Sequence, residues 1–166
     1  MTIQELYLKT VFCCMACDGD IAPEEVDMVR QLTTDSDIFT GLKVEEQLHS
    51  YIEGINNNGT EFLKHYLRDI AAAELSDEEQ LTIVRLAIQT IEADNVIQYS
   101  EVKLFKKVRF RLSVTDEQIL TEHPDKEDFL LPDIRVTDDP AWENIKFDDI
   151  KLTEIAKLAN NEYTKE

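Results

Sequence analysis

Two stretches of this sequence decide its fold, MACDGDIAPEEVDMVRQL at residues 15–32 and IEADNVIQYSEVKLFKKV at residues 91–108. They align without a gap at a constant offset, since Asp94 falls on Asp18 (94 − 18 = 76). In each, an apolar helical pattern leads to an aspartate, a short turn, an isoleucine and a second helical pattern with a glutamate in its first turn. The sequence therefore predicts an internal repeat of two helix–turn–helix units.

Apolar residues recur at helical spacing on both sides of these stretches. Gly and Pro number only four each, which favours long helices joined by few turns. The spacing predicts an all-α, compact bundle of about seven helices with an internal pseudo-twofold repeat. The predicted helices cover 2–17, 23–33, 44–55, 60–71, 77–91, 102–112 and a short segment after residue 115.

The chain is predicted to have two parts, a helical domain at 1–121 and an acidic extension at 122–166. Three of the four prolines lie in the extension and interrupt any helix there, apart from a terminal one at 150–160. The extension also holds the single tryptophan, Trp142, with several apolar residues close behind it. Because exposing such a cluster is unfavourable, we expect the extension to dock on the helical core.

The net charge of −18 and the sequence pI near 4.4 bound the class of partner. Such a field repels nucleic acid and anionic lipid surfaces, and it attracts metal cations and basic protein surfaces. We therefore expect a protein partner and no nucleic acid. The alternative interpretation is that the acidity only keeps the protein in solution.

The start of the chain and its cysteines predict a cytoplasmic location. The first residues show neither a basic start nor a long apolar run, so no signal peptide and no membrane insertion are expected. Cys13, Cys14 and Cys17 are odd in number and clustered, which is not a disulfide framework. They are predicted to be reduced, buried core residues.

Acidic residues gather at both turns of the repeat, and oxygen ligands of this kind suit Ca²⁺ or Mg²⁺. A twofold repeat would bring the two turns together. The spacing is not that of an EF-hand loop. The alternative is structural, with the aspartates bonding the turn backbone and the glutamates stabilising helix starts. The candidate metal ligands are Asp18, Asp20, Glu24, Glu25, Asp94 and Glu101.

The helix predicted at 102–112 is the exception to the overall acidity. Residues 102–114 hold five bases and no acid. Lys103, Lys106 and Lys107 share one face of this helix and form a candidate partner-binding strip. The alternative is a solvated face that balances acidic neighbours.

The first turn resembles the hallmark of the TerB-like family, a family named for a tellurite-resistance protein. That hallmark is an Ala-Asp-Gly stretch, an Ile and a Pro-Glu-Glu helix start, in two related copies. The first copy here runs from Ala16 to Glu25 and matches it, whereas the second, from Glu92 to Glu101, lacks the Gly and the Pro-Glu. The resemblance covers roughly residues 1–120.

The resemblance implies a non-enzymatic, all-helical module in a stress response of the tellurite-resistance kind, with divalent cations bound by acidic residues. No Ser/His/Asp set, GxGxxG or phosphate-binding loop appears, so no catalytic residue is predicted. The leading hypothesis is a module that binds a divalent cation, a protein partner, or both. The alternative is a purely structural interaction scaffold with no metal.

Overall fold

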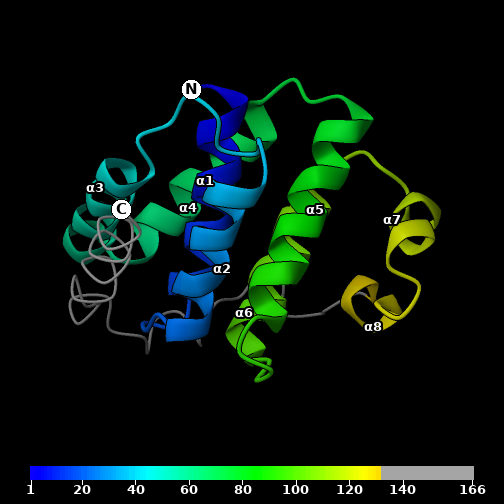
Figure 1. Cartoon of the computed structure of the whole chain (residues 1–166). Helices are drawn as coiled ribbons and strands as arrows, with labels where there is room; N and C mark the ends of the chain where they lie inside the picture. The colour runs from blue at the N-terminus through cyan, green and yellow to red at the C-terminus, as the bar shows by residue number, and fades with distance from the viewer. Residues whose placement is uncertain (132–166) are drawn as a thin grey trace.

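The computed structural model describes residues 1–131, and within them every regular element is a helix. The predicted all-α bundle is confirmed (Figure 1). The helices are α1 (Ile3–Ala16), α2 (Pro23–Asp35), α3 (Val44–Asn58), α4 (Thr60–Ala72), α5 (Asp77–Glu92), α6 (Tyr99–Phe110), α7 (Asp116–Glu122) and α8 (Glu127–Leu130). None of these is long and apolar enough to cross a membrane.

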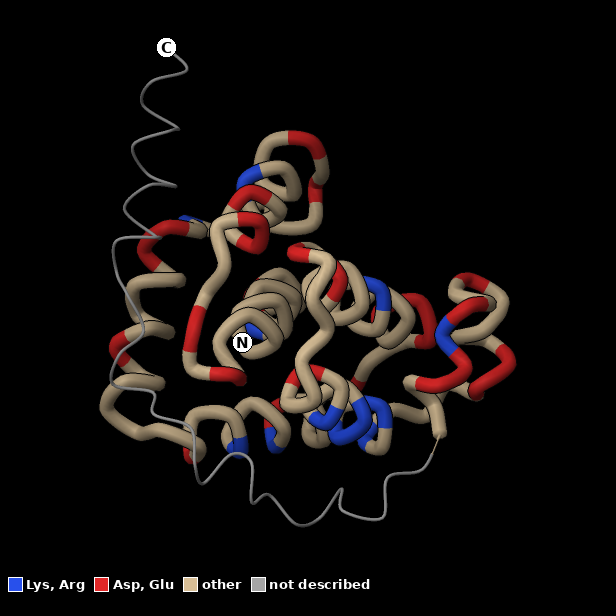
Figure 2. Tube along the Cα trace, turned by 90° about the horizontal axis from the view of Figure 1, so that it is seen from below, with Lys and Arg blue, Asp and Glu red and all other residues tan. Residues whose placement is uncertain are grey.

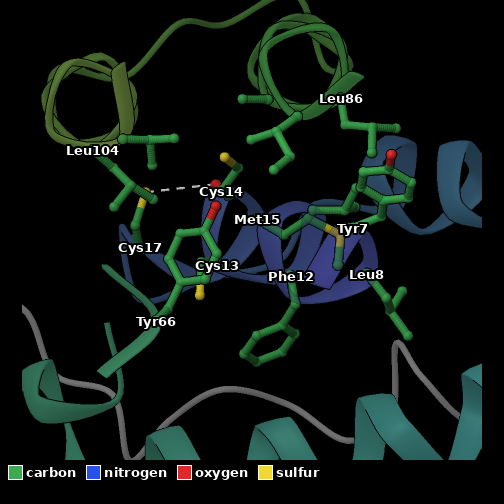
Figure 3. Close-up of a cluster of buried hydrophobic side chains, with 14 of the residues drawn as sticks. Tyr7, Leu8, Phe12, Cys13, Cys14, Met15, Cys17, Tyr66, Leu86 and Leu104 are labelled. Atoms are coloured by element: carbon green, nitrogen blue, oxygen red, sulfur yellow. Dashed lines mark hydrogen bonds between the residues drawn. The ribbon is translucent and has the colours of Figure 1, made fainter. Parts of the chain in front are cut away.

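Helix α1 forms the centre of the bundle and contacts α3, α4, α5 and α6. Every residue from Leu6 to Ala16 is buried. Figure 3 shows Phe12 and Cys14 pointing to different sides of α1, with Cys14 toward Leu86 of α5 and Leu104 of α6. A helix that is apolar all round is stable only when it is surrounded, and α1 is surrounded.

The helix starts follow the capping residues of the sequence. Thr2, Ser76 and Thr115 each accept a hydrogen bond from the backbone N–H three residues later, and a Glu or Gln side chain at that position accepts one in return. Helix α2 begins at Pro23 as predicted, where the missing N–H is not needed.

Helix α8 lies inside the range predicted to be an extension. Its Phe129 is buried, with its ring 5.4 Å from that of Phe105 on α6. Helix α8 therefore packs on α6. The predicted terminal helix and the docking of Trp142 both lie outside the described residues and stay predictions.

The two helix–turn–helix units lie side by side with both turns at the same end of the bundle (Figure 1). Their second helices differ in how they pack. Helix α2 buries only three residues, whereas α6 buries seven of its twelve. The pseudo-twofold relation of whole halves stays a prediction, while the turns themselves are closely alike.

Candidate functional site: two carboxylate turns at one end of the bundle

The α1–α2 and α5–α6 turns are built in the same way. Asp18 Oδ1 accepts a hydrogen bond from the backbone N–H of Asp20 (3.1 Å). In the second turn, Asp94 Oδ1 accepts one from the backbone N–H of Val96 (3.0 Å). Each aspartate thus closes its own turn, and the pair keeps the offset seen in the sequence.

The residue after each aspartate has a left-handed backbone. Gly19 has φ 88° and Asn95 has φ 61°. Glycine adopts this conformation at no steric cost, and asparagine is among the few other residues that tolerate it. The loss of glycine in the second copy therefore leaves the turn geometry intact.

A glutamate then holds the start of each following helix. Glu25 Oε1 accepts a hydrogen bond from the backbone N–H of Ala22 (2.8 Å), and Glu101 Oε1 accepts one from that of Gln98 (2.9 Å). Both helix starts gain an acceptor for a backbone donor that lacks a partner within the helix. The structural role that the sequence allowed for these four carboxylates is therefore present.

The two glutamates are unusually buried for ionisable groups. Glu25 and Glu101 each keep only 4% of their surface exposed. Burial, with a smaller contribution from the carboxylates of Glu101, Asp18 and Asp94 and against the hydrogen bond from Ala22, raises the pKa of Glu25 to about 9. Burial likewise raises the pKa of Glu101 to about 7, again with a contribution from Asp18 and Asp94.

Asp18 responds to the same surroundings. Burial raises its pKa, and the charges of Asp20 and Asp94 act in the same direction, while hydrogen bonds from the backbone oppose the shift. The structure therefore brings Asp18, Glu25, Asp94 and Glu101 within electrostatic reach of one another. We call these four residues the carboxylate group.

Asp20 and Glu24 take up different positions from the carboxylate group. Asp20 is exposed, and its Oδ1 accepts a hydrogen bond from the backbone N–H of Ile21 (3.0 Å). Glu24 is exposed in the first turn of α2. Across residues 1–131, no three Asp, Glu, His or Cys side chains are arranged to hold a metal ion.

Figure 2 looks onto the end that carries the two turns. Acidic residues lie along both turns, and basic residues lie together on α6. The sequence predicted a partner-binding strip of three lysines there, and the structure buries two of the three. Lys103 and Lys107 keep 1% and 6% of their surface exposed, and Lys106 is half-buried.

The burial of these lysines follows from the position of α6, which contacts α1, α4, α5 and α8. A helix contacted from four directions has little surface left for an open strip. Long lysine side chains can lie along such covered surface through their methylene groups. That Lys103, Lys106 and Lys107 bind a partner stays a prediction.

The three cysteines are buried and unpaired by disulfides, as predicted. Burial raises the pKa of each thiol, and nearby acidic groups raise those of Cys14 and Cys17 further. Cys17 Sγ donates a hydrogen bond to the backbone oxygen of Cys14 (3.5 Å; Figure 3). These thiols are core groups with little thiolate character.

A largely buried ion pair joins α1 to α4 and was not predicted from the sequence. Lys9 Nζ lies 2.9 Å from Asp69 Oδ2 on α4 and 5.1 Å from the ring centre of Phe62. The signal was available, because Lys9 is the only charged residue between Leu6 and Cys17. A charge inside an apolar helix calls for a partner.

Comparison with known proteins identifies no relative of this chain. It matches no protein-family model, no curated protein and no solved structure. The resemblance to the TerB-like family therefore stays a prediction from the residues of the two turns.

Proposed function

We propose that this chain is a non-enzymatic helical module that binds a divalent cation, Ca²⁺ or Mg²⁺, at its paired turns. One observation carries the proposal. Repeat-related carboxylates from two turns 76 residues apart (94 − 18 = 76) lie within electrostatic reach of one another at one end of the bundle, and two of them are buried. Burial is the main cause of the raised pKa values of Asp18, Glu25 and Glu101, and nearby carboxylates act in the same direction, so a cation would relieve that repulsion.

The chemistry of the carboxylate group fits a hard cation. The turn and cap hydrogen bonds use one oxygen each of Asp18, Asp94, Glu25 and Glu101. A carboxylate has two oxygens, so a cation can share the group without displacing those bonds. Water completes the coordination of Mg²⁺ and often of Ca²⁺ in proteins. Binding must displace protons, because the pKa of Glu25 is raised to about 9.

Titration calorimetry with CaCl₂ and with MgCl₂ tests the proposal on four forms of the protein. Wild type should give heat and a rise in melting temperature. Asp18→Asn combined with Glu25→Gln should give neither, since two ligands are lost. The matched control, Asp35→Asn with Glu53→Gln, removes the same charge from exposed positions and should behave like wild type. The fourth form, Asp94→Asn with Glu101→Gln, tests the second turn.

Two results would contradict cation binding. One is the absence of heat and of any thermal shift in wild type with both ions. The other is undiminished binding by the Asp18→Asn, Glu25→Gln protein. Proton release, measured as a dependence of the heat on the buffer's ionisation enthalpy, should accompany binding near neutral pH.

A second function is an interaction scaffold that needs no ion. It is favoured by the hydrogen bonds that already occupy all four carboxylates and by the lack of a three-ligand arrangement within residues 1–131. In that case added ions change nothing in either protein, and the double substitution acts on stability alone, because the Asn and Gln oxygens keep the turn and cap hydrogen bonds.

The resemblance to the TerB-like family supports a role in a cytoplasmic metal-stress response. We extend the proposal to that setting. Expression of the chain in a tellurite-sensitive bacterium should raise its tolerance, and the Asp18→Asn, Glu25→Gln protein should do so less. Equal tellurite tolerance with and without the chain would show that the chain has no such role.

A further inference from the structure

A groove between α2 and α5 lies beside the two turns. It has a volume of about 520 Å³ and is lined by residues of both helices. The lining holds three acidic side chains and no Lys or Arg. Its residues are Glu24, Asp27, Met28, Gln31, Gln89, Glu92 and Ala93.

The groove exists because α2 is only lightly packed. Of its thirteen residues, only Glu25, Val26 and Val29 are buried. The side of α2 toward the groove therefore presents polar and acidic side chains around the partly buried Met28. Such a surface can accept a further segment without unpacking the core.

Two exposed apolar residues follow the groove at the α5–α6 turn. Val96 and Ile97 come three and four residues after Ala93 and keep 54% and 49% of their surface exposed. Ile21, the counterpart of Ile97 in the first turn, keeps 4%. The second turn thus exposes an apolar pair where the first has Asp20 and a buried isoleucine.

Because the two turns are copies of one repeat, the exposed apolar pair of the second turn can be compared directly with the first turn. Both turns have the same backbone and capping bonds, so turn geometry does not require valine or exposed isoleucine at these positions. Scattered single exposed apolar residues are ordinary, whereas Val96 and Ile97 adjoin each other and follow shortly after Ala93, which lines the groove.

The charge of the surroundings defines the chemistry of the partner. Glu24, Asp27 and Glu92 line the groove, Asp94 lies at the turn, and the whole chain has a net charge of −18. This field repels nucleic acids and anionic membranes and attracts a basic segment.

We propose that the groove between α2 and α5, together with Val96 and Ile97, docks a basic amphipathic segment of a protein partner. Lysine or arginine side chains of that segment face the acidic lining, and its apolar side chains cover Val96 and Ile97. Charge steers the encounter, and apolar burial supplies most of the affinity.

Two acids of the groove already have partners on the chain. Asp27 Oδ1 lies 2.9 Å from Arg30, and Glu92 pairs with Lys126. Ion pairs this near the surface contribute little to stability, so they can exchange for pairs with a partner. The inference does not depend on the cation proposal, because neither Val96 nor Ile97 belongs to the carboxylate group.

Fluorescence anisotropy with the full chain tests the inference. The probe is a labelled synthetic helix of about four turns with Lys on one face and Leu on the other. Wild type should bind it in the presence of EDTA, and a peptide with Glu in place of Lys should not bind. Independence from divalent ions separates this result from the outcome of the calorimetric titration.

Substitutions locate the contact. Val96→Ser with Ile97→Ser should weaken binding about tenfold, because two apolar contacts are lost. Glu24→Gln with Asp27→Asn should weaken it and reduce its salt dependence. The matched control is Phe110→Ser, since Phe110 is 79% exposed at the opposite end of α6, and it should leave binding unchanged.

Circular dichroism of each variant confirms that it is folded. No binding by wild type would overturn the inference, as would equal binding by wild type and the Val96→Ser, Ile97→Ser protein. Sedimentation of wild type alone covers one further outcome. A dimer that the double serine substitution abolishes would assign this surface to a second copy of the chain, against the inference.

Discussion

Glu25 holds the start of a helix although its burial disfavours the charged form of its carboxyl group. Its carboxylate accepts the backbone N–H of Ala22 and so holds the start of α2, yet it is buried among other carboxylates. Only the hydrogen-bonding oxygen is needed for the cap. The negative charge is therefore dispensable for folding. Its effect on stability can be tested by changing the pH and by replacing Glu25 with glutamine.

The raised pKa values of Glu25 and Glu101 predict that stability falls as pH rises. Both groups have an ordinary value of 4.5, and the fold raises them to about 9 and about 7. Between those limits the folded state holds protons that the unfolded state has lost, so the free energy of unfolding decreases with pH. Thermal melts should show a higher melting temperature near pH 5 than near pH 8, and the reverse order would contradict the raised pKa values.

Replacing Glu25 by glutamine should stabilise the protein at alkaline pH. The glutamine oxygen keeps the cap, because Gln serves at this position of a capping box as well as Glu. Near pH 8 we expect a gain of about 1–3 kcal/mol, and near pH 5 almost none. Chemical denaturation at the two pH values measures it. Glu53→Gln, at an exposed site, should change neither value by more than about 0.5 kcal/mol.

The cysteines give a second test at this scale. All three thiols are buried, and burial raises their pKa values. A thiol reagent should therefore label the native protein at least about tenfold more slowly than the denatured protein. Fast labelling of the native state would mean that α1 opens readily.

At the scale of elements, most helix starts were predictable, because capping is local. Thr60, Ser76 and Thr115 mark their helices within a residue or two, and Pro23 marks α2. Helix α8 was missed, since its four residues are too few for a periodic pattern. Local chemistry within a few residues of each boundary thus accounts for what the sequence revealed.

Helix α1 shows why burial was less predictable than helicity. Its apolar residues recur at helical spacing in the sequence, but the structure buries every residue from Leu6 to Ala16. The signal was the near absence of polar residues rather than their spacing. Lys9 obscured that signal, because its partner Asp69 is 60 residues away and becomes a neighbour only in the folded chain.

The N-terminal cap of α5 is predicted to stabilise that helix. Ser76 Oγ accepts the backbone N–H of Glu79 (3.1 Å), and Glu79 accepts that of Ser76 (2.9 Å). Ser76→Ala should lower the free energy of unfolding by about 1 kcal/mol. Ser50→Ala, in the exposed middle of α3, is the control and should be neutral. Equal effects in urea denaturation would show that the cap does not stabilise α5.

At the scale of the whole molecule, the six candidate ligands predicted from the sequence include the four residues of the carboxylate group, but the sequence did not predict their geometry. Asp18 and Asp94 were paired by their positions in the repeat, and the structure brings their turns to one end of the bundle. Their surroundings were beyond the sequence, because burial of Glu25 and Glu101 depends on how α2 and α6 pack. The same holds for the covered lysines of α6.

The net charge of −18 predicts that salt stabilises the folded chain. Like charges held close in the native state repel one another, and ions screen them over about 10 Å at 0.1 M. Raising NaCl from about 0.02 to about 0.3 M should therefore raise the melting temperature by a few degrees. A decrease would show that attractive ion pairs, such as that of Lys9 and Asp69, outweigh the repulsion.

The same melts separate general screening from the proposed site. At matched ionic strength, MgCl₂ or CaCl₂ should raise the melting temperature of wild type beyond the value in NaCl, because a bound ion stabilises only the folded state. The Asp18→Asn, Glu25→Gln protein should respond to the divalent and monovalent salts alike. If wild type also responds alike, the carboxylates at the two turns act as helix caps and as part of the general acidic field, and the cation proposal is wrong.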